Sequence, residues 1–219
     1  WSSDVCSSDL GDVFIWTPEI NEGNVMNLND HLFNLGATWL NEIRIYNPLG
    51  AAVWDEKAGL LHASRGSGRL EIDATGKVLN EHPLPLSNTL RIARRASGSP
   101  LFLSFATWSN GVKAFDSDGK ELWSYPESGQ GIDDVWAADL DSDGTDEIIV
   151  GFNGSTGLHV LNAAGEALWK FTGIGNVWHV AAGDVLGEGK PRVVTTSAAG
   201  RVHVFEVAAF LQHLFLPSR

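Results

Sequence analysis

Short stretches of alternating apolar and polar residues, separated by tight polar turns, dominate the chain from residue 43 onward. A repeat of two residues indicates half-buried β-strands, and long runs with the 3.6-residue period of an amphipathic helix are missing. Gly is frequent, with 24 residues, and tryptophan is unusually so, with nine. These features predict short strands joined by tight turns.

One hairpin pattern recurs along the chain. Alternating apolar residues are followed by Asp or Asn, two further residues, Gly, and an apolar residue before Trp or Asn. The Asp or Asn side chain is expected to cap the turn backbone, and the Gly to supply the positive φ that the turn requires. We expect Trp54, Trp123 and Trp169 at equivalent places on the outgoing strands, where they pack between sheets. The copies are IRIYNPLGAAVW at 43–54, LEIDATGKVLN at 70–80, VKAFDSDGKELW at 112–123 and LHVLNAAGEALW at 158–169.

A second pattern precedes the hairpins and sets the repeat length. DDVWAADLDSDGTDEIIVGF at 133–152 is echoed by NVWHVAAGDVLGEGKPRVVTTS at 176–197, and Gly76, Gly119 and Gly165 of the turns are 43 and 46 residues apart. Four strands in about 40 to 50 residues are typical of a propeller blade. The sequence therefore predicts an all-β fold, a partial β-propeller of about three to four four-stranded antiparallel blades.

The domain organisation follows from these repeats. Residues 11–58 form an N-terminal segment or junction of unclear fold, with one strand in GDVFIW and a β-hairpin at 43–54. Either the blade after this hairpin lacks its first strand, or the segment 43–54 serves another role. The tail at 208–219 is either a closing helix or the result of a frame error. Propeller blades are predicted at 59–82 (incomplete), 89–126, 134–172 and 177–207.

The first ten residues, WSSDVCSSDL, resemble the translation of a widely used sequencing adapter, and we set them aside as an artefact of a metagenomic fragment. We accordingly expect the native N-terminus, any signal peptide and further blades to be missing. The only cysteine, Cys6, lies in this stretch, so disulfides and thiolate sites are not expected after residue 10. The net charge of −12 becomes −10 without Asp4 and Asp9. An acidic chain argues against nucleic-acid or anionic-membrane binding, and no apolar run is long enough to span a bilayer.

The loop at 139–147, DLDSDGTDE, has the strongest site pattern. Asp139, Asp141 and Asp143 at positions 1, 3 and 5 place three carboxylates inside a tight loop, and Gly144 at position 6 permits the sharp turn. Carboxylate oxygens are hard donors, and Ca²⁺ takes about 6 to 8 oxygens at roughly 2.3–2.6 Å. The pattern predicts a Ca²⁺ site.

Two further positions complete the predicted donor set. Thr145 at position 7 offers a backbone carbonyl, and Glu147 at position 9 is the natural remaining carboxylate. An EF-hand would require Glu at position 12, where Val150 stands, and the flanking segments read as strands.

DLDSDGTDEIIVG resembles the calcium loop of FG-GAP/VCBS repeats, the units of integrin-α-like propellers. The resemblance implies that Asp139, Asp141, Asp143, Thr145 and Glu147 hold the metal, although Glu at position 9 departs from the commoner Asp. It also implies an exported, cell-surface or periplasmic protein. The Gly-x-x-Leu-Trp hairpins resemble quinoprotein-like propeller repeats as well.

Other loops are expected to lack metal. The equivalent loop at 184–192 keeps the turn but loses the acids at positions 3 and 9. The loop at 93–101 has no acids, and Arg94 and Arg95 would repel a cation. Asp116 and Asp118 belong to a hairpin turn.

No catalytic residue or organic cofactor is predicted from the motifs. The histidines form no metal-ligand pair, His159 and His203 are expected to serve packing, and the Gly-rich stretch at 154–157 lacks the Lys and helix of a phosphate loop. Trp108, beside a loop, is the tryptophan least explained by packing. We expect a non-catalytic module, stabilised by calcium, that recognises a protein or a glycan. The alternatives are part of a propeller enzyme, a polysaccharide lyase or quinone-dependent dehydrogenase, and an accessory domain of an upstream catalytic domain.

Overall fold

The structure is a computed structural model. It describes the backbone of β1 (Val5–Ser7) and β2 (Val13–Ile15), and residues 51–206 apart from 56, 66, 86–88 and 127–130. β1 and β2 form an antiparallel pair, so the strand expected in GDVFIW is present. Most of the expected hairpin at 43–54 and the tail at 208–219 lie outside the described residues.

Four antiparallel sheets follow one another along the chain, and neighbouring strands in each sheet are consecutive in sequence. The first three sheets have four strands each, and the fourth has three. The sheets consist of β3 (Ala51–Asp55), β4 (Leu60–Arg65), β5 (Gly68–Ile72) and β6 (Val78–Pro83); β7 (Thr89–Ala93), β8 (Leu101–Phe105), β9 (Val112–Phe115) and β10 (Glu121–Tyr125); β11 (Ile132–Ala138), β12 (Glu147–Phe152), β13 (Leu158–Leu161) and β14 (Ala167–Phe171); and β15 (Val177–Gly183), β16 (Arg192–Ser197) and β17 (Val202–Glu206).

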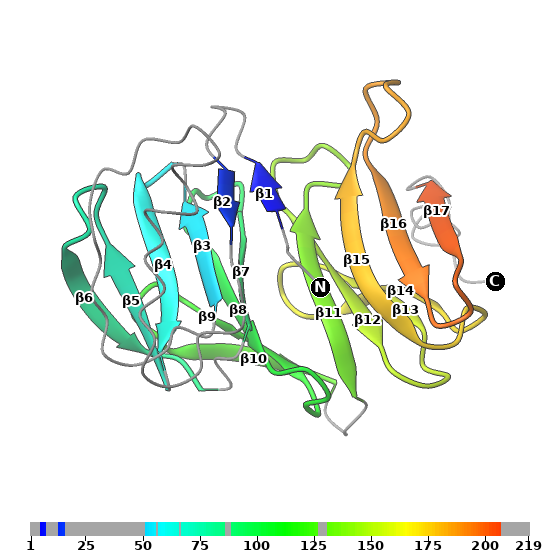
Figure 1. The fold of residues 1–219 in the computed structure, drawn as a ribbon, viewed down its shortest axis with the longest axis horizontal. Helices are drawn as coiled ribbons and strands as arrows, with labels where there is room; N and C mark the ends of the chain where they lie inside the picture. The colour runs from blue at the N-terminus through cyan, green and yellow to red at the C-terminus, as the bar shows by residue number, and fades with distance from the viewer. Residues whose placement is uncertain are drawn as a thin grey trace.

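The sheets stand side by side in an arc, as Figure 1 shows. The first strands of the sheets, β3, β7, β11 and β15, contact one another in that order and form the inner side of the arc. Radially arranged four-stranded antiparallel sheets whose first strands face a common axis define a β-propeller. The predicted fold class, a partial β-propeller of three to four blades, is confirmed.

The first blade resolves a question that the sequence left open. β3 pairs with β4 along its whole length, Ala51 opposite Ser64 and Asp55 opposite Leu60, and supplies the first strand of the blade. The expected place of Trp54 on an outgoing strand is wrong, because Trp54 lies on this inner strand, where its side chain is 41% exposed. Residues 51–54 of the hairpin copy therefore lie on the first strand of a blade, whereas Trp123 and Trp169 lie on fourth strands.

The core lies between the blades, which explains the continuous apolar sequence of β12. Ile148 and Val150 pack toward the second blade, in a cluster with Leu103 and Val112. Ile149, on the opposite face of the same strand, packs toward Val177 and Val193 of the fourth blade. A strand buried on both faces reads as an apolar run because neither set of alternating side chains meets water.

The outer hairpins have the turn chemistry that the sequence predicts. Asp73 accepts hydrogen bonds from the backbone of Thr75 and Lys77, and Asp116 and Asn162 repeat the arrangement in the next two blades. The turn glycines all have positive φ, at 84°, 82° and 83°.

Trp123 on β10 packs between blades, as expected. Its indole N–H donates to the carbonyl of Ala163 at 3.0 Å, and its ring lies so close to Gly165 that a Cβ there would be 2.6 Å from it. Trp169 on β14 likewise stacks on Phe171 and contacts Phe205 of the fourth blade, with ring centroids 5.5 and 5.6 Å apart.

Candidate metal centre

The loop at 139–147, called the acidic loop from here on, connects β11 to β12, the first and second strands of the third blade. The Asp139 carboxylate accepts hydrogen bonds from the backbone N–H of Asp143 at 3.1 Å and of Gly144 at 2.9 Å. Ser142 and Gly144 both have positive φ, 66° and 85°. The chain therefore coils around the Asp139 side chain, which is the turn that the Asp-x-Asp-x-Asp-Gly pattern predicts.

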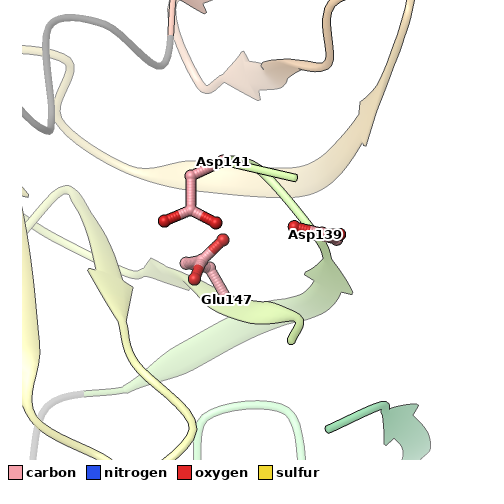
Figure 2. Close-up of side chains that lie close together, drawn as sticks. All are labelled: Asp139, Asp141 and Glu147. Carbon is pink, nitrogen blue, oxygen red and sulfur yellow. The ribbon is translucent and has the colours of Figure 1, made fainter. Parts of the chain in front are cut away.

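Three of the five predicted ligands come together in this loop. One carboxylate oxygen from each of Asp139, Asp141 and Glu147 lies within 4.8 Å of the others. In Figure 2 the carboxylates of Asp141 and Glu147 face each other, with Asp139 beside them. Asp143 is not in this group, and its carboxylate accepts a hydrogen bond from the Thr145 N–H at 2.7 Å. Oxygen donors alone make a set that fits Ca²⁺.

Glu147 is the buried member of the group. Its side chain is only 8% exposed, and one of its oxygens accepts a hydrogen bond from the Leu140 N–H at 2.8 Å. Burial, and then the negative charges of Asp141, Asp143 and Asp139, raise the pKa of Glu147 to about 7. Without a counter-ion, negative charge is thus costly here, and a bound cation would relieve that cost.

The acidic loop is also tied to the second blade. Arg94 and Asp146 exchange two hydrogen bonds, from Arg94 N–H to the Asp146 carboxylate at 2.7 Å and from Asp146 N–H to the Arg94 carbonyl at 2.8 Å. The Ala96 N–H donates to the Thr145 hydroxyl at 3.3 Å. Burial raises the pKa of Asp146, while the Arg94 contacts lower it. Ordering this loop therefore also orders an interface between blades.

The fourth blade contains the same turn with a different charge arrangement. Asp184 accepts hydrogen bonds from the N–H groups of Glu188 and Gly189, at 2.9 and 2.7 Å, as Asp139 does from its own loop. At position 9, where the third blade has Glu147, stands Arg192, whose guanidinium pairs with Glu188 and Glu206. Arg192 thus neutralises Glu188 of this loop and Glu206 of β17, whereas the acidic loop contains no lysine or arginine.

A charged cluster on the inner strands was missed from the sequence. Arg91 on β7 donates to the Val135 carbonyl at 3.1 Å and to the Asp134 carboxylate at 3.4 Å. The other oxygen of Asp134 accepts from the Val180 N–H at 3.0 Å and lies 3.7 Å from Nδ1 of His179. Burial raises the pKa of Asp134. The cluster joins three blades, and each member alone looks like an ordinary polar strand residue.

His159 has the packing role that the sequence favours. It is buried, 4.6 Å from Phe152 between ring centroids, and its Nδ1 lies 2.8 Å from the Tyr125 hydroxyl. Burial, followed by the charge of Lys170, lowers the pKa of His159 to about 4. The imidazole is therefore neutral at neutral pH and belongs to the core.

Trp108 stands apart from the packed tryptophans. Its side chain is 72% exposed and its φ is 66°, a left-handed conformation that is uncommon for a bulky residue. The N–H of Trp108 donates to the Ile132 carbonyl at 2.7 Å, which fixes the backbone on the adjacent blade. Strands alternate in direction, so this loop between β8 and β9 lies at the end of the blades opposite to the acidic loop.

Comparisons with known proteins agree with the class that the fold defines, a β-propeller. Residues 106–203 match the family described as the lambda-carrageenase beta-propeller domain. A solved structure described as the Dos1 propeller is similar, with a TM-score of 0.50 and 14% sequence identity over 75% of this chain and 46% of that chain. The chain thus spans about half the length of this relative. No curated protein is significantly similar to the chain.

Within the part of the chain that the structure describes, no helix is long and apolar enough to cross a membrane.

Proposed function

We propose that the chain is a calcium-stabilised, non-catalytic β-propeller module of the FG-GAP/VCBS type that recognises a glycan or a protein outside the cytoplasm. The observation that carries the proposal is the convergence of Asp139, Asp141 and Glu147 in a loop between two buried strands. The carbonyl of Thr145 and the carboxylate of Asp143 would complete the ligand set when the metal is bound.

The metal's role in this proposal is structural. Bound Ca²⁺ neutralises clustered carboxylates and holds the loop that hydrogen-bonds to Arg94 and Ala96 of the second blade. A ligand that binds only the folded state stabilises it by about 2.7 kcal/mol at a concentration of about 100 times its Kd. Calcium in the extracellular space would supply this stabilisation.

The test of the metal compares melting temperatures in calcium and in EDTA. The wild-type chain should melt about 5–10 °C lower in EDTA, since about 1 kcal/mol corresponds to roughly 2–4 °C for a chain of this size. Asp141→Ala should abolish the difference. Asp116→Ala is the matched control, because Asp116 caps a hairpin turn and has no place in the acidic group. Equal melting temperatures of the wild type in the two buffers would refute the site.

Two observations favour a glycan as the ligand. The matching family is named after lambda-carrageenase, an enzyme that acts on a polysaccharide, carrageenan. Trp108 presents a large aromatic face to solvent from a backbone held in a left-handed conformation. Such conformations persist where surrounding structure enforces them, often at ligand sites, and an aromatic face packs well on the apolar C–H face of a sugar ring. Trp108→Ala should weaken saccharide binding, while Trp178→Ala, also exposed, should not.

The family match also favours a second candidate, a propeller domain of a polysaccharide-degrading enzyme. In that case the propeller binds or positions the polysaccharide, and catalytic residues lie elsewhere in a longer protein. The two candidates differ in one measurement. The chain alone should bind saccharide without releasing reducing ends, and release of reducing ends by the chain would refute the non-catalytic assignment.

A further inference from the structure

A cavity lies between the loops of the first three blades, at the same end as the acidic loop. It has a volume of about 340 Å³, at the small end of the range for ligand sites, which is roughly 300–1,000 Å³. The β3–β4 loop, the β7–β8 loop and the acidic loop each contribute to its wall. The lining residues are Asp55, Lys57, Arg94, Arg95, Ala96, Gly98, Pro100 and Gly144.

The lining is cationic in a chain that is acidic as a whole. Lys57, Arg94 and Arg95 line the cavity together with a single carboxylate, Asp55, whereas the chain carries a net charge of −12. The three cations give the cavity a positively charged wall that attracts anions, and the acidic loop, which contributes Gly144 to the lining, places Asp143 next to that residue in sequence.

The single carboxylate of the lining is already engaged. Asp55 is 7% exposed, and its Oδ1 accepts hydrogen bonds from the N–H groups of Lys57 and Ala58, at 3.1 and 3.2 Å. Its Oδ2 lies 4.0 Å from Nε2 of His62. Asp55 therefore serves the turn backbone, and among the described residues no lysine or arginine nitrogen lies within 4.0 Å of its carboxylate.

The three cations keep donor groups available. Within the described residues, none of them is paired with a carboxylate within 4.0 Å. Toward the described residues Arg95 donates through Nε, to the Ser99 carbonyl at 2.9 Å. The Lys57 ammonium reaches over Gly98, 3.1 Å from the position where a Cβ would be. Arg94 lies near Asp146, but the carboxylate of that residue is held by the Arg94 backbone N–H.

From these observations we propose that the Lys57–Arg94–Arg95 cavity binds the anionic substituent of an acidic saccharide, a sulfate ester or a carboxylate. Arginine and lysine bind such oxyanions through charge-assisted hydrogen bonds, and a small cavity admits one charged group with its sugar ring. The proposal rests on the recognition function above and names its ligand class. Calcium bound to the acidic loop would reduce the negative charge beside the cavity, but the metal is no part of the proposed anion contacts. The cavity and Trp108 lie at opposite ends of the blades and are separate sites.

The test measures affinity for three sets of oligosaccharides at about 0.1 M salt, where exposed charges farther apart than about 10 Å are screened. Lambda-carrageenan fragments carry sulfate esters, polygalacturonate fragments carry carboxylates, and agarose fragments are neutral. One acidic set should bind at least about tenfold more tightly than the neutral set, equivalent to about 1.4 kcal/mol. Which acidic set binds identifies the substituent.

Variants assign the effect to the cavity. Lys57→Gln combined with Arg94→Gln should weaken binding of the acidic set at least about tenfold. Lys190→Gln is the control for Lys57→Gln alone, since each removes one exposed positive charge from a loop at the same end of the blades, and only Lys57 lines the cavity. It should change the affinity less than about twofold. The side chains of Lys57 and Arg94 have no ion pairs within the described residues, so we expect each variant to keep the wild-type melting temperature, and the melting curve shows that it folds.

Three results would overturn the proposal: equal binding of neutral and acidic sets, equal loss from Lys190→Gln and from the cavity variant, or tighter binding of poly-glutamate than of either acidic saccharide. Each measurement is made in calcium and in EDTA, which separates this inference from the metal site. Acidic-saccharide binding without a calcium-dependent melting shift would refute the metal site alone. A calcium-dependent shift without acidic-saccharide binding would refute this inference alone.

Discussion

Glu147 should make the metal-free protein less stable than a neutral variant, by an amount that grows with pH. The pKa of this buried carboxyl rises from 4.5 to about 7 in the folded chain. Above pH 4.5 the unfolded chain loses the proton that the folded chain still holds, so this group's contribution to the free energy of unfolding falls as pH rises toward 7. In EDTA, Glu147→Gln should remove that loss and keep an acceptor for the Leu140 N–H.

The magnitude follows from the two pKa values. Each pH unit between them corresponds to about 1.4 kcal/mol, so the full difference between wild type and variant is about 3 kcal/mol at pH 7 and above. Because the Asp141 and Asp143 side chains that contribute to the shift are exposed, solvent screening makes this an upper value. Near pH 4 the difference should vanish.

Urea unfolding at several pH values between 4 and 8 measures this difference directly. The wild type must be compared with Glu147→Gln at each pH, because His62 and His159 also make the free energy of unfolding depend on pH, with the opposite sign. Burial lowers the pKa of both histidines to about 4. That dependence is common to both proteins and cancels in the difference. With calcium in excess the order should invert, since only the wild type has the Glu147 ligand. A pH-independent difference in EDTA would refute the electrostatic reasoning.

Three further predictions concern the blades. In urea unfolding, Gly157→Ala should lower the free energy of unfolding by at least about 2 kcal/mol more than Gly154→Ala does, because a Cβ at Gly157 would lie 2.1 Å from the Phe171 carbonyl oxygen, whereas a Cβ at Gly154 would meet nothing within 4 Å. Equal losses would contradict the backbone geometry. Trp123→Phe should lower the free energy of unfolding by about 1–2 kcal/mol, because it removes the hydrogen bond to the Ala163 carbonyl, and Trp178→Phe, at an exposed residue, by less than about 0.5 kcal/mol. Similar losses would argue against the packing of Trp123 between blades. A triple variant of the fourth-blade loop, with Leu186→Asp, Glu188→Asp and Arg192→Glu, should bind two calcium ions per chain in calorimetry, and circular dichroism checks that it keeps the native strand content. A single ion bound by the folded variant would contradict the equivalence of the two loops.

The fold was predictable because its repeats have physical causes that act locally. A turn Asp or Asn with a Gly three residues later specifies a hairpin, and the spacing of Gly119 and Gly165 specifies a blade. The first blade was harder to predict, since β3 ends at Asp55 without that turn pattern and the local similarity of 43–54 to the hairpins suggested another register. Local pattern fixes a turn, whereas tertiary pairing decides which strands join.

The candidate metal centre was predictable for the same reason, because its donors lie within nine residues of one another. The cationic cavity and the Arg91–Asp134 cluster were not, since their members come from different blades and meet only through the propeller arrangement. In the sequence, Arg94 and Arg95 stand out only as residues unsuited to a metal site. Their position opposite Lys57 could not be read from the chain.

Calorimetric titration with calcium tests the central claim most directly. The wild-type chain at pH 7.5 should bind one Ca²⁺, Asp141→Ala should bind none, and Asp116→Ala should bind as the wild type does. Asp141 and Asp116 both lie in loops at the same end of the blades, but only Asp141 belongs to the acidic group, whereas the half-buried Asp116 caps its own turn. Absence of binding by the folded wild type at millimolar calcium, or equal binding by Asp141→Ala, would contradict the account.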